Sequence, residues 1–326
     1  MTTTPVYVRV QTATRTRTAG TAAGVLLGLL GVGACVVAVL APPEPARRAA
    51  EILIDALLPG VLFAMCAAML SVGVEAVFAS GGLARASEVA GVRPWFDLVA
   101  FCTLGIPSDQ PLQTQLVRNR IGAGETGRRA FAAVTTTAGF GPLLIVAVLV
   151  ATRFGWLLPV WMVTAVLLAV CLAWVCEPAV ERHVRSVGVA PAALDVALDA
   201  AVRRATDRGT SVMRGGVLGS LIVAATAFMP SGWVSALEGL PAAAIFLAIV
   251  LALVAAPGPL FAPFLAASLG IFGIGAQLAF LVVATFADRR LLWCWAGEYG
   301  QAVSLRAIAC VLPLAYAAGA WTEVIV

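Results

Sequence analysis

The sequence predicts an all-α, polytopic membrane protein, and composition is the first reason. Hydrophobic residues make up 61% of the chain and charged residues 12%, about half the share that is usual in soluble domains. Apolar runs of about 20 residues, the length of a membrane-spanning helix, recur along the chain. The strict alternation of apolar and polar residues that marks a transmembrane barrel does not occur. We therefore expect about eight to ten helical membrane segments in the cytoplasmic membrane.

Hydropathy places these segments along the chain. Residues 1–18 precede them and are expected to form a cytoplasmic tail. The run 19–41 is too long for the apolar core of a signal peptide, so we expect an extra first span there. The other segments are 52–79, 95–117, 129–152, 156–178, 215–236, 240–269, 273–288 and 291–321, the last divided by polar residues near 298–301.

Residues 179–214 are the one long polar interruption. They divide the chain into a first membrane half, 19–178, and a second membrane half, 215–326. The interruption carries more arginines than acidic residues, which predicts a cytoplasmic linker. Apolar residues at helical spacing within 192–208 predict a short amphipathic helix that lies in the membrane interface and leads into the next span.

The stretch FCTLGIPSDQPLQTQ at 101–115 interrupts the third segment. A plain span would place the loops before and after it on opposite sides of the membrane. Both loops carry arginines, which favour the cytoplasmic side: Arg85, Arg93, Arg118, Arg120, Arg128 and Arg129. A re-entrant helical hairpin with its tip near 105–111 satisfies this bias, because prolines break a helix and irregular backbone is tolerated where it lines a cavity.

A second interruption lies in the other half of the chain. The segment 240–269 is broken by APGPLFAP at 256–263, and a glycine-rich turn and an apolar helix follow each break, at 121–134 and 269–283. With a cytoplasmic linker between them, the two half-repeats would be inverted, and their broken hairpins would meet near the midplane. This architecture is typical of secondary transporters. Two ordinary spans with proline kinks are the alternative.

Four stretches resemble a bacterial predicted-permease family whose best-known relatives export trivalent organoarsenicals. They are FCTLGIP at 101–107, IGAGETGRRAF at 121–131, GPLFAPFLAAS at 258–268 and GAQLAFL at 275–281. They occur in both halves and in the family's order. The resemblance implies the two-repeat permease fold and a transport function.

The chain departs from the family pattern at the residues that would carry thiolate chemistry. Cys102 matches the first box, but Leu104 stands where the family has a second cysteine. Gly258, Leu260 and Ala262 stand where the second box has cysteine, glutamate and aspartate. Soft metal ions need two or three sulfur ligands. We therefore expect no metal site and no cofactor.

The candidate substrate-binding residues lie in and around the two breaks. Asp109 is the foremost, because a carboxylate within a span costs about 2.5–3.5 kcal/mol on insertion scales and so usually faces a cavity, a partner or an ion path. It would carry a proton or bind a cation; a hydrated position on an interfacial loop is the alternative. The other candidates are Cys102, Ser108, Gln110, Gln113, Thr136 and Gln277.

Three neighbouring features have simpler interpretations. The threonines at 135–137 would either hydrogen-bond a solute or bond back to the preceding helical turn. Asp288 adjoins two arginines and is expected to form a surface ion pair. Arg128 and Arg129 are expected to anchor the helix at the cytoplasmic side.

The function that these features favour is a permease. It would move a small solute or ion by alternating access, at a site formed by the broken helices 102–115 and 256–264. The alternative is a degenerate permease-like subunit that scaffolds or regulates a partner complex. An enzyme is disfavoured, because no HExxH, aspartate-rich or nucleotide-binding motif occurs. The expected partners are the lipid bilayer, the solute, and a second copy or another membrane protein, but not nucleic acid.

Overall fold

The computed structural model describes residues 43–79, 117, 120–121, 126–152, 157–184, 194–227 and 229–325. Every regular element in these ranges is a helix, which confirms the all-α fold class. The expected tail at 1–18, the extra span at 19–41 and the first break at 102–115 lie outside the described residues.

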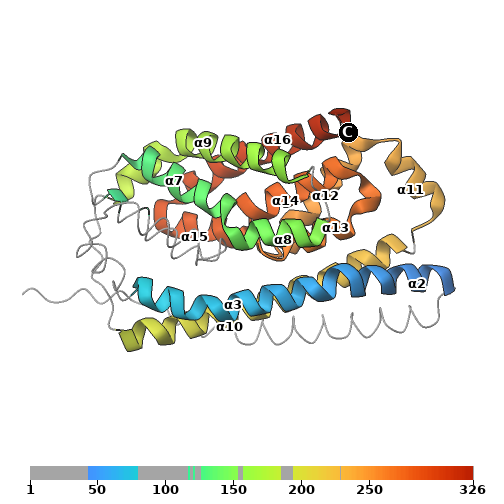
Figure 1. The fold of residues 1–326 in the computed structure, drawn as a ribbon. Coiled ribbons are helices and arrows are strands. Elements are labelled where there is room, and N and C mark those ends of the chain that lie inside the picture. The colour runs from blue at the N-terminus through green and yellow to red at the C-terminus, as the bar shows by residue number, and fades with distance from the viewer. Residues whose placement is uncertain are drawn as a thin grey trace, which may run out of the picture.

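The helices are labelled in Figure 1. In chain order they are α2 (Pro43–Ile52), a π-helical turn (Leu53–Leu57), α3 (Leu58–Ala79), α7 (Gly127–Phe140), α8 (Pro142–Thr152), α9 (Leu157–Val184), α10 (Leu194–Ala227), α11 (Ser231–Glu238), α12 (Pro241–Ala255), α13 (Ala262–Ser268), a 3₁₀ turn (Gly270–Phe272), α14 (Ile274–Phe286), α15 (Arg289–Tyr299) and α16 (Gln301–Ile325).

Two expected segments differ from the structure. The segment 129–152 is not one helix, because Gly141 leaves helical geometry between α7 and α8 and Pro142, which begins α8, has no backbone N–H to donate. The expected amphipathic helix within 192–208 and the beginning of the expected segment 215–236 belong to one helix, because α10 runs through 214 and 215 without interruption. No proline stands between 194 and 227, and an ion pair of 2.5 Å between Asp199 and Arg203 links consecutive turns of this helix.

Two long helix pairs organise the molecule. In the first, α3 lies along α10, on one side of the view in Figure 1. In the second, α9 packs against α16. The helix α7 packs on α9 in the first half, and α14 packs on α16 in the second half. The two halves of the chain are therefore in contact through both long pairs.

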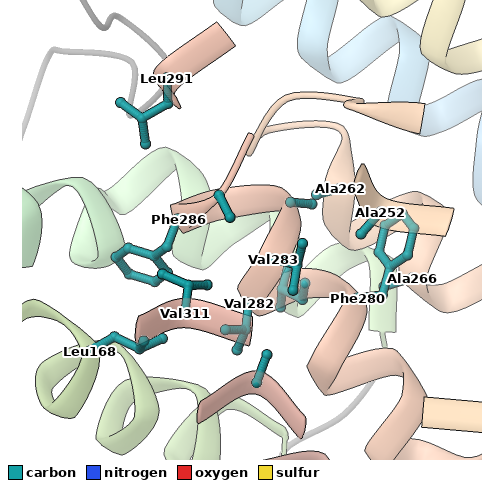
Figure 2. Packing of buried hydrophobic residues seen from close by; sticks show 14 of the residues in the cluster. Leu168, Ala252, Ala262, Ala266, Phe280, Val282, Val283, Phe286, Leu291 and Val311 are labelled. Carbon is teal, nitrogen blue, oxygen red and sulfur yellow. The ribbon is translucent and has the colours of Figure 1, made fainter. Parts of the chain in front are cut away.

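The centre of the core is α14. All its residues from Gly275 to Phe286 are buried, under α12, α13, α9 and α16. Phe286 lies beside Val311 of α16, with Leu168 of α9 close by (Figure 2), and its ring is 5.9 Å from that of Trp161. A helix that is apolar on all sides is stable only when it is enclosed in this way.

Two described helices are long and apolar enough to cross a membrane by length and composition alone. They are Leu158–Cys176, within α9, and Gln301–Ile325, which is α16. Two shorter apolar stretches, Leu58–Ala67 and Pro241–Ala255, lie in α3 and α12. These lengths agree with a membrane location.

Candidate functional site

The second predicted interruption is present and separates α12 from α13. Ala256 closes α12 in the left-handed region, with φ 40° and ψ 56°, and its N–H donates to the carbonyl of Ala252 at 3.0 Å. Pro257 and Pro259 have no N–H, so the helix cannot continue through them. Helical hydrogen bonding resumes at the start of α13, where the N–H of Ala262 donates to the carbonyl of Gly258 at 2.9 Å.

Glycines on the α3–α10 pair make room for α13. The ring of Phe264 lies over Gly60 of α3, where an added Cβ would be 2.5 Å from its Cγ. Two further contacts join α13 and the residue before it to α10. A Cβ added to Gly215 would lie 3.0 Å from Cδ1 of Phe261, and a Cβ added to Gly219 would lie 3.0 Å from Cδ1 of Leu265. The broken segment is thereby held in the interior of the described helices.

This packing predicts opposite effects for two glycine substitutions in α3. Gly60→Ala would push its methyl group into Phe264 and should destabilise the protein by about 1–3 kcal/mol. Gly73→Ala meets nothing within 4 Å and should stabilise the helix by about 0.5–1 kcal/mol. Thermal unfolding in detergent measures both. If the two variants unfold at the same midpoint temperature, Phe264 does not pack against Gly60 of α3.

The N-terminus of α14 faces a carboxylate from the last turn of α16. Gly273 precedes the helix with φ 90°, a conformation that favours glycine. An oxygen of Glu323 accepts a hydrogen bond from the N–H of Gly275 at 2.7 Å. A carboxylate at this end of a helix accepts a hydrogen bond from an N–H group that has no partner within the helix. Its negative charge also interacts favourably with the positive end of the helix dipole.

Glu323 reaches this position because α14 and α16 cross at two glycines. A Cβ on Gly319 would lie 2.7 Å from the carbonyl oxygen of Gly275, and a Cβ on Gly275 would press into the carbonyl of Gly319. The two backbones are therefore in direct contact. Glu323 follows Gly319 by four residues, one turn along the same face of α16.

Gln277 is the sequence-predicted site residue that the structure describes in full. Its side chain is 3% exposed, and its amide nitrogen faces Gly270, where an added Cβ would be 3.3 Å away. Its amide oxygen Oε1 is buried, and no described group donates a hydrogen bond to it. A buried acceptor without a donor costs about 1–3 kcal/mol. Such a group is a candidate contact for a solute, an ion or water.

The structure does not describe the side chains of the other predicted site residues. Cys102, Ser108, Asp109, Gln110 and Gln113 lie outside the described residues. Thr136 belongs to α7, but its side chain is not described.

The neighbouring features are described more fully. Thr135 donates to the carbonyl of Phe131 at 2.7 Å, so this threonine bonds back to its own helix. The guanidinium of Arg128 lies 3.7 Å from the centre of the Trp174 ring and ties α7 to α9. The expected surface position of Asp288 is wrong, because this residue is 2% exposed at the junction of α14 and α15.

Glu323 is the polar group that sequence reasoning missed. Two sequence features could have indicated it. Glu323 follows Gly319 by four residues, which places both on one helix face, and glycines at 273 and 275 allow another helix to approach the start of α14 closely. The described residues contain no group of three or more histidine, cysteine, aspartate or glutamate side chains that could hold a metal ion. Comparisons with protein-family models, with curated proteins and with solved structures found no match.

Proposed function

We propose that the chain is a multi-pass permease of the cytoplasmic membrane that moves a small solute or ion by alternating access. The observation that carries the proposal is Gln277, whose buried amide oxygen has no donor among the described groups, inside a predominantly apolar core. It lies on the helix that follows the break between α12 and α13. Its counterpart in the first half would be the stretch at 102–115, with Asp109.

The outer surface of the described helices supports a bilayer as the surrounding medium. Large apolar side chains are exposed on α9, α12 and α16, and also on α3, among them Val163, Trp174, Val254, Trp321 and Leu70, each more than half exposed. Soluble proteins rarely expose apolar patches of this extent. Lipid would cover them, and the broken helix α13 lies in the interior, as backbone at membrane depth must.

The helix pairs support two related halves. If the halves correspond, α3 matches α10, α7 matches α14 and α9 matches α16. The contacts between α3 and α10 and between α9 and α16 then join equivalent helices, and α7 sits on α9 as α14 sits on α16. A two-fold axis between inverted halves produces this pattern, which is common in secondary transporters. The family resemblance of both halves to the predicted permeases points the same way.

The chemistry of the described residues favours a solute that donates a hydrogen bond. The amide oxygen of Gln277 is an acceptor without charge. Glu323 adds a carboxylate at the start of the same helix, where it accepts from the N–H of Gly275, two residues before Gln277. Neutral and cationic solutes therefore fit this end of the proposed path better than anionic ones.

Flux into proteoliposomes tests the proposal. The full chain is reconstituted, and entry of radiolabelled glycerol, a small organic cation and a small organic anion is compared with entry into protein-free vesicles. We expect uptake of the neutral or cationic compound above the protein-free rate. If none of the three moves, and the chain purifies with a stoichiometric membrane partner, the scaffold function replaces the permease.

A further inference from the structure

The helix α16 carries a long uncharged stretch between two charged residues. Arg306 lies in its second turn and Glu323 in its last turn, and residues 307–322 between them include no charged side chain. At a rise of about 1.5 Å per residue, the two charged residues are about 25 Å apart along the helix axis. The hydrocarbon core of a bilayer is about 30 Å thick. The stretch is therefore long enough to cross most of it.

Two exposed tryptophans lie at the level of Arg306. Trp174 of α9 is 60% exposed, and the carbonyl of the next residue, Val175, accepts from Arg306 at 3.2 Å. Trp293 of α15 is 80% exposed, and the carbonyl of the residue before it accepts from the hydroxyl of Ser304 on α16. Both tryptophan side chains are therefore exposed near the start of α16.

Two further exposed tryptophans lie at the level of Glu323. Trp321 precedes Glu323 by two residues and is 68% exposed. Trp233 of α11 is also 68% exposed, and α11 packs on the 3₁₀ turn Gly270–Phe272. Gly273, which follows that turn, lies against Glu323. Figure 1 shows α11 and the C-terminus at the same end of the molecule, away from α7 and α15. Because tryptophan is enriched at both interfaces between membrane and water, the two sets fit the two boundaries of a bilayer.

Arginines from two helices gather around Trp174. The guanidinium of Arg128 lies 3.7 Å from the centre of its ring, and Arg129 is exposed in the same turn of α7. Arg306 approaches from α16, through its bond to the neighbouring carbonyl. Arginines clustered beside a membrane span attract anionic lipids. We call this set the arginine rim: Trp174, Trp293, Arg128, Arg129 and Arg306. The opposite set is the glutamate rim: Trp233, Trp321 and Glu323.

We propose that the arginine rim binds the headgroups of anionic phospholipids and that the glutamate rim marks the other boundary of the bilayer without this preference. A guanidinium donates paired hydrogen bonds to a phosphate, and an indole ring is stable at headgroup level. Glu177 follows on the next turn of α9, but three arginines against this one glutamate leave the rim positive. The proposal rests on the bilayer location in the proposed function and adds the class of lipid at one boundary.

Tryptophan fluorescence in vesicles of brominated phospholipid tests both parts. Two full-length reporters keep one tryptophan each, Trp174 or Trp321, and carry phenylalanine at the other seven tryptophan positions. Bromine atoms near the headgroup should quench both reporters more strongly than bromine atoms at the chain ends. Trp174 should favour brominated phosphatidylglycerol over brominated phosphatidylcholine by about fivefold in relative affinity. The two lipids should quench Trp321 equally.

Substitution of the arginines identifies the source of the preference. Arg129→Gln and Arg306→Gln together, in the Trp174 reporter, should make the two lipids equivalent. Arg47→Gln is the matched control and should leave the preference unchanged, because Arg47 is exposed on α2 and pairs with Glu51 at 2.9 Å. An excess of soluble glycerol phosphate should not remove the preference. If it does, the rim binds free phosphate and not lipid, and the proposal is wrong.

The outcomes separate this proposal from the bilayer location on which it rests. Equal quenching of Trp174 by the two lipids overturns the arginine rim and leaves the bilayer location intact. If neither lipid quenches either reporter, the bilayer location itself is contradicted. The natural chain provides a check that keeps every tryptophan: phosphatidylglycerol added to protein in detergent should raise the midpoint of thermal unfolding more than phosphatidylcholine does. Equal midpoints with the two lipids would also overturn the proposal.

Discussion

Gly275→Ala is expected to destabilise the protein more than any other substitution that adds one methyl group to α14. The new Cβ would meet the carbonyl oxygen of Gly319 and lie 2.6 Å from Cγ of Glu323. Backbone atoms cannot rotate away as a side chain can, so α14 and α16 would have to separate. We expect a loss of about 3 kcal/mol or more, together with the hydrogen bond from Gly275 to Glu323. Thermal unfolding of the purified protein in detergent measures the change.

Gly297→Ala is the matched control. Gly297 is a helical glycine of the neighbouring α15, it is exposed, and an added Cβ would meet nothing within 4 Å. Its midpoint should equal or slightly exceed that of the natural protein, because alanine favours a helix over glycine. Similar midpoints for the two variants would show that α14 and α16 do not cross through backbone contact.

Gln277→Leu is expected to abolish transport while the fold is retained or becomes more stable. Leucine has a similar volume and removes the buried oxygen that lacks a donor, which should raise the free energy of unfolding by about 1–3 kcal/mol. Loss of a contact to the solute should lower the uptake rate by at least tenfold. Uptake into proteoliposomes and thermal unfolding are measured on the same preparation.

Thr285→Val provides the control for this substitution. Thr285 is buried on the same helix and donates only to the carbonyl of Leu281, at 2.8 Å. Its replacement should leave the uptake rate unchanged. If Gln277→Leu transports at the natural rate, Gln277 is not part of the solute path.

The helix breaks could be predicted from the sequence because proline and glycine act locally. The interruption at 256–261 and the start of α14 near 274 follow from these residues. The division that polar residues near 298–301 predicted falls at Gly300, which has φ 89° and separates α15 from α16. The continuity of α10 could not be predicted from hydropathy, because polarity marks where a helix leaves an apolar medium and not where it ends. The split at Gly141 was missed because the residues on both sides are apolar.

The site was less accessible to sequence reasoning than the fold. Gln277 was identified because it lies on the apolar helix that follows the second break. Glu323 was not identified, because its position at the start of α14 depends on the close crossing of two helices far apart in the chain. Contacts of this kind are set by tertiary packing and leave no periodic signal.

Water access to Gln277 tests the central claim most directly. Gln277→Cys and, as a control, Ala284→Cys are placed singly in a chain without its natural cysteines; Ala284 is fully buried about two turns further along α14. A membrane-impermeant methanethiosulfonate reagent is added to protein in lipid vesicles. A permease predicts that the cysteine at 277 reacts through water, at a rate that the neutral or cationic solute lowers, while the cysteine at 284 stays unreactive. If both positions stay unreactive, the break between α12 and α13 does not line a solute path.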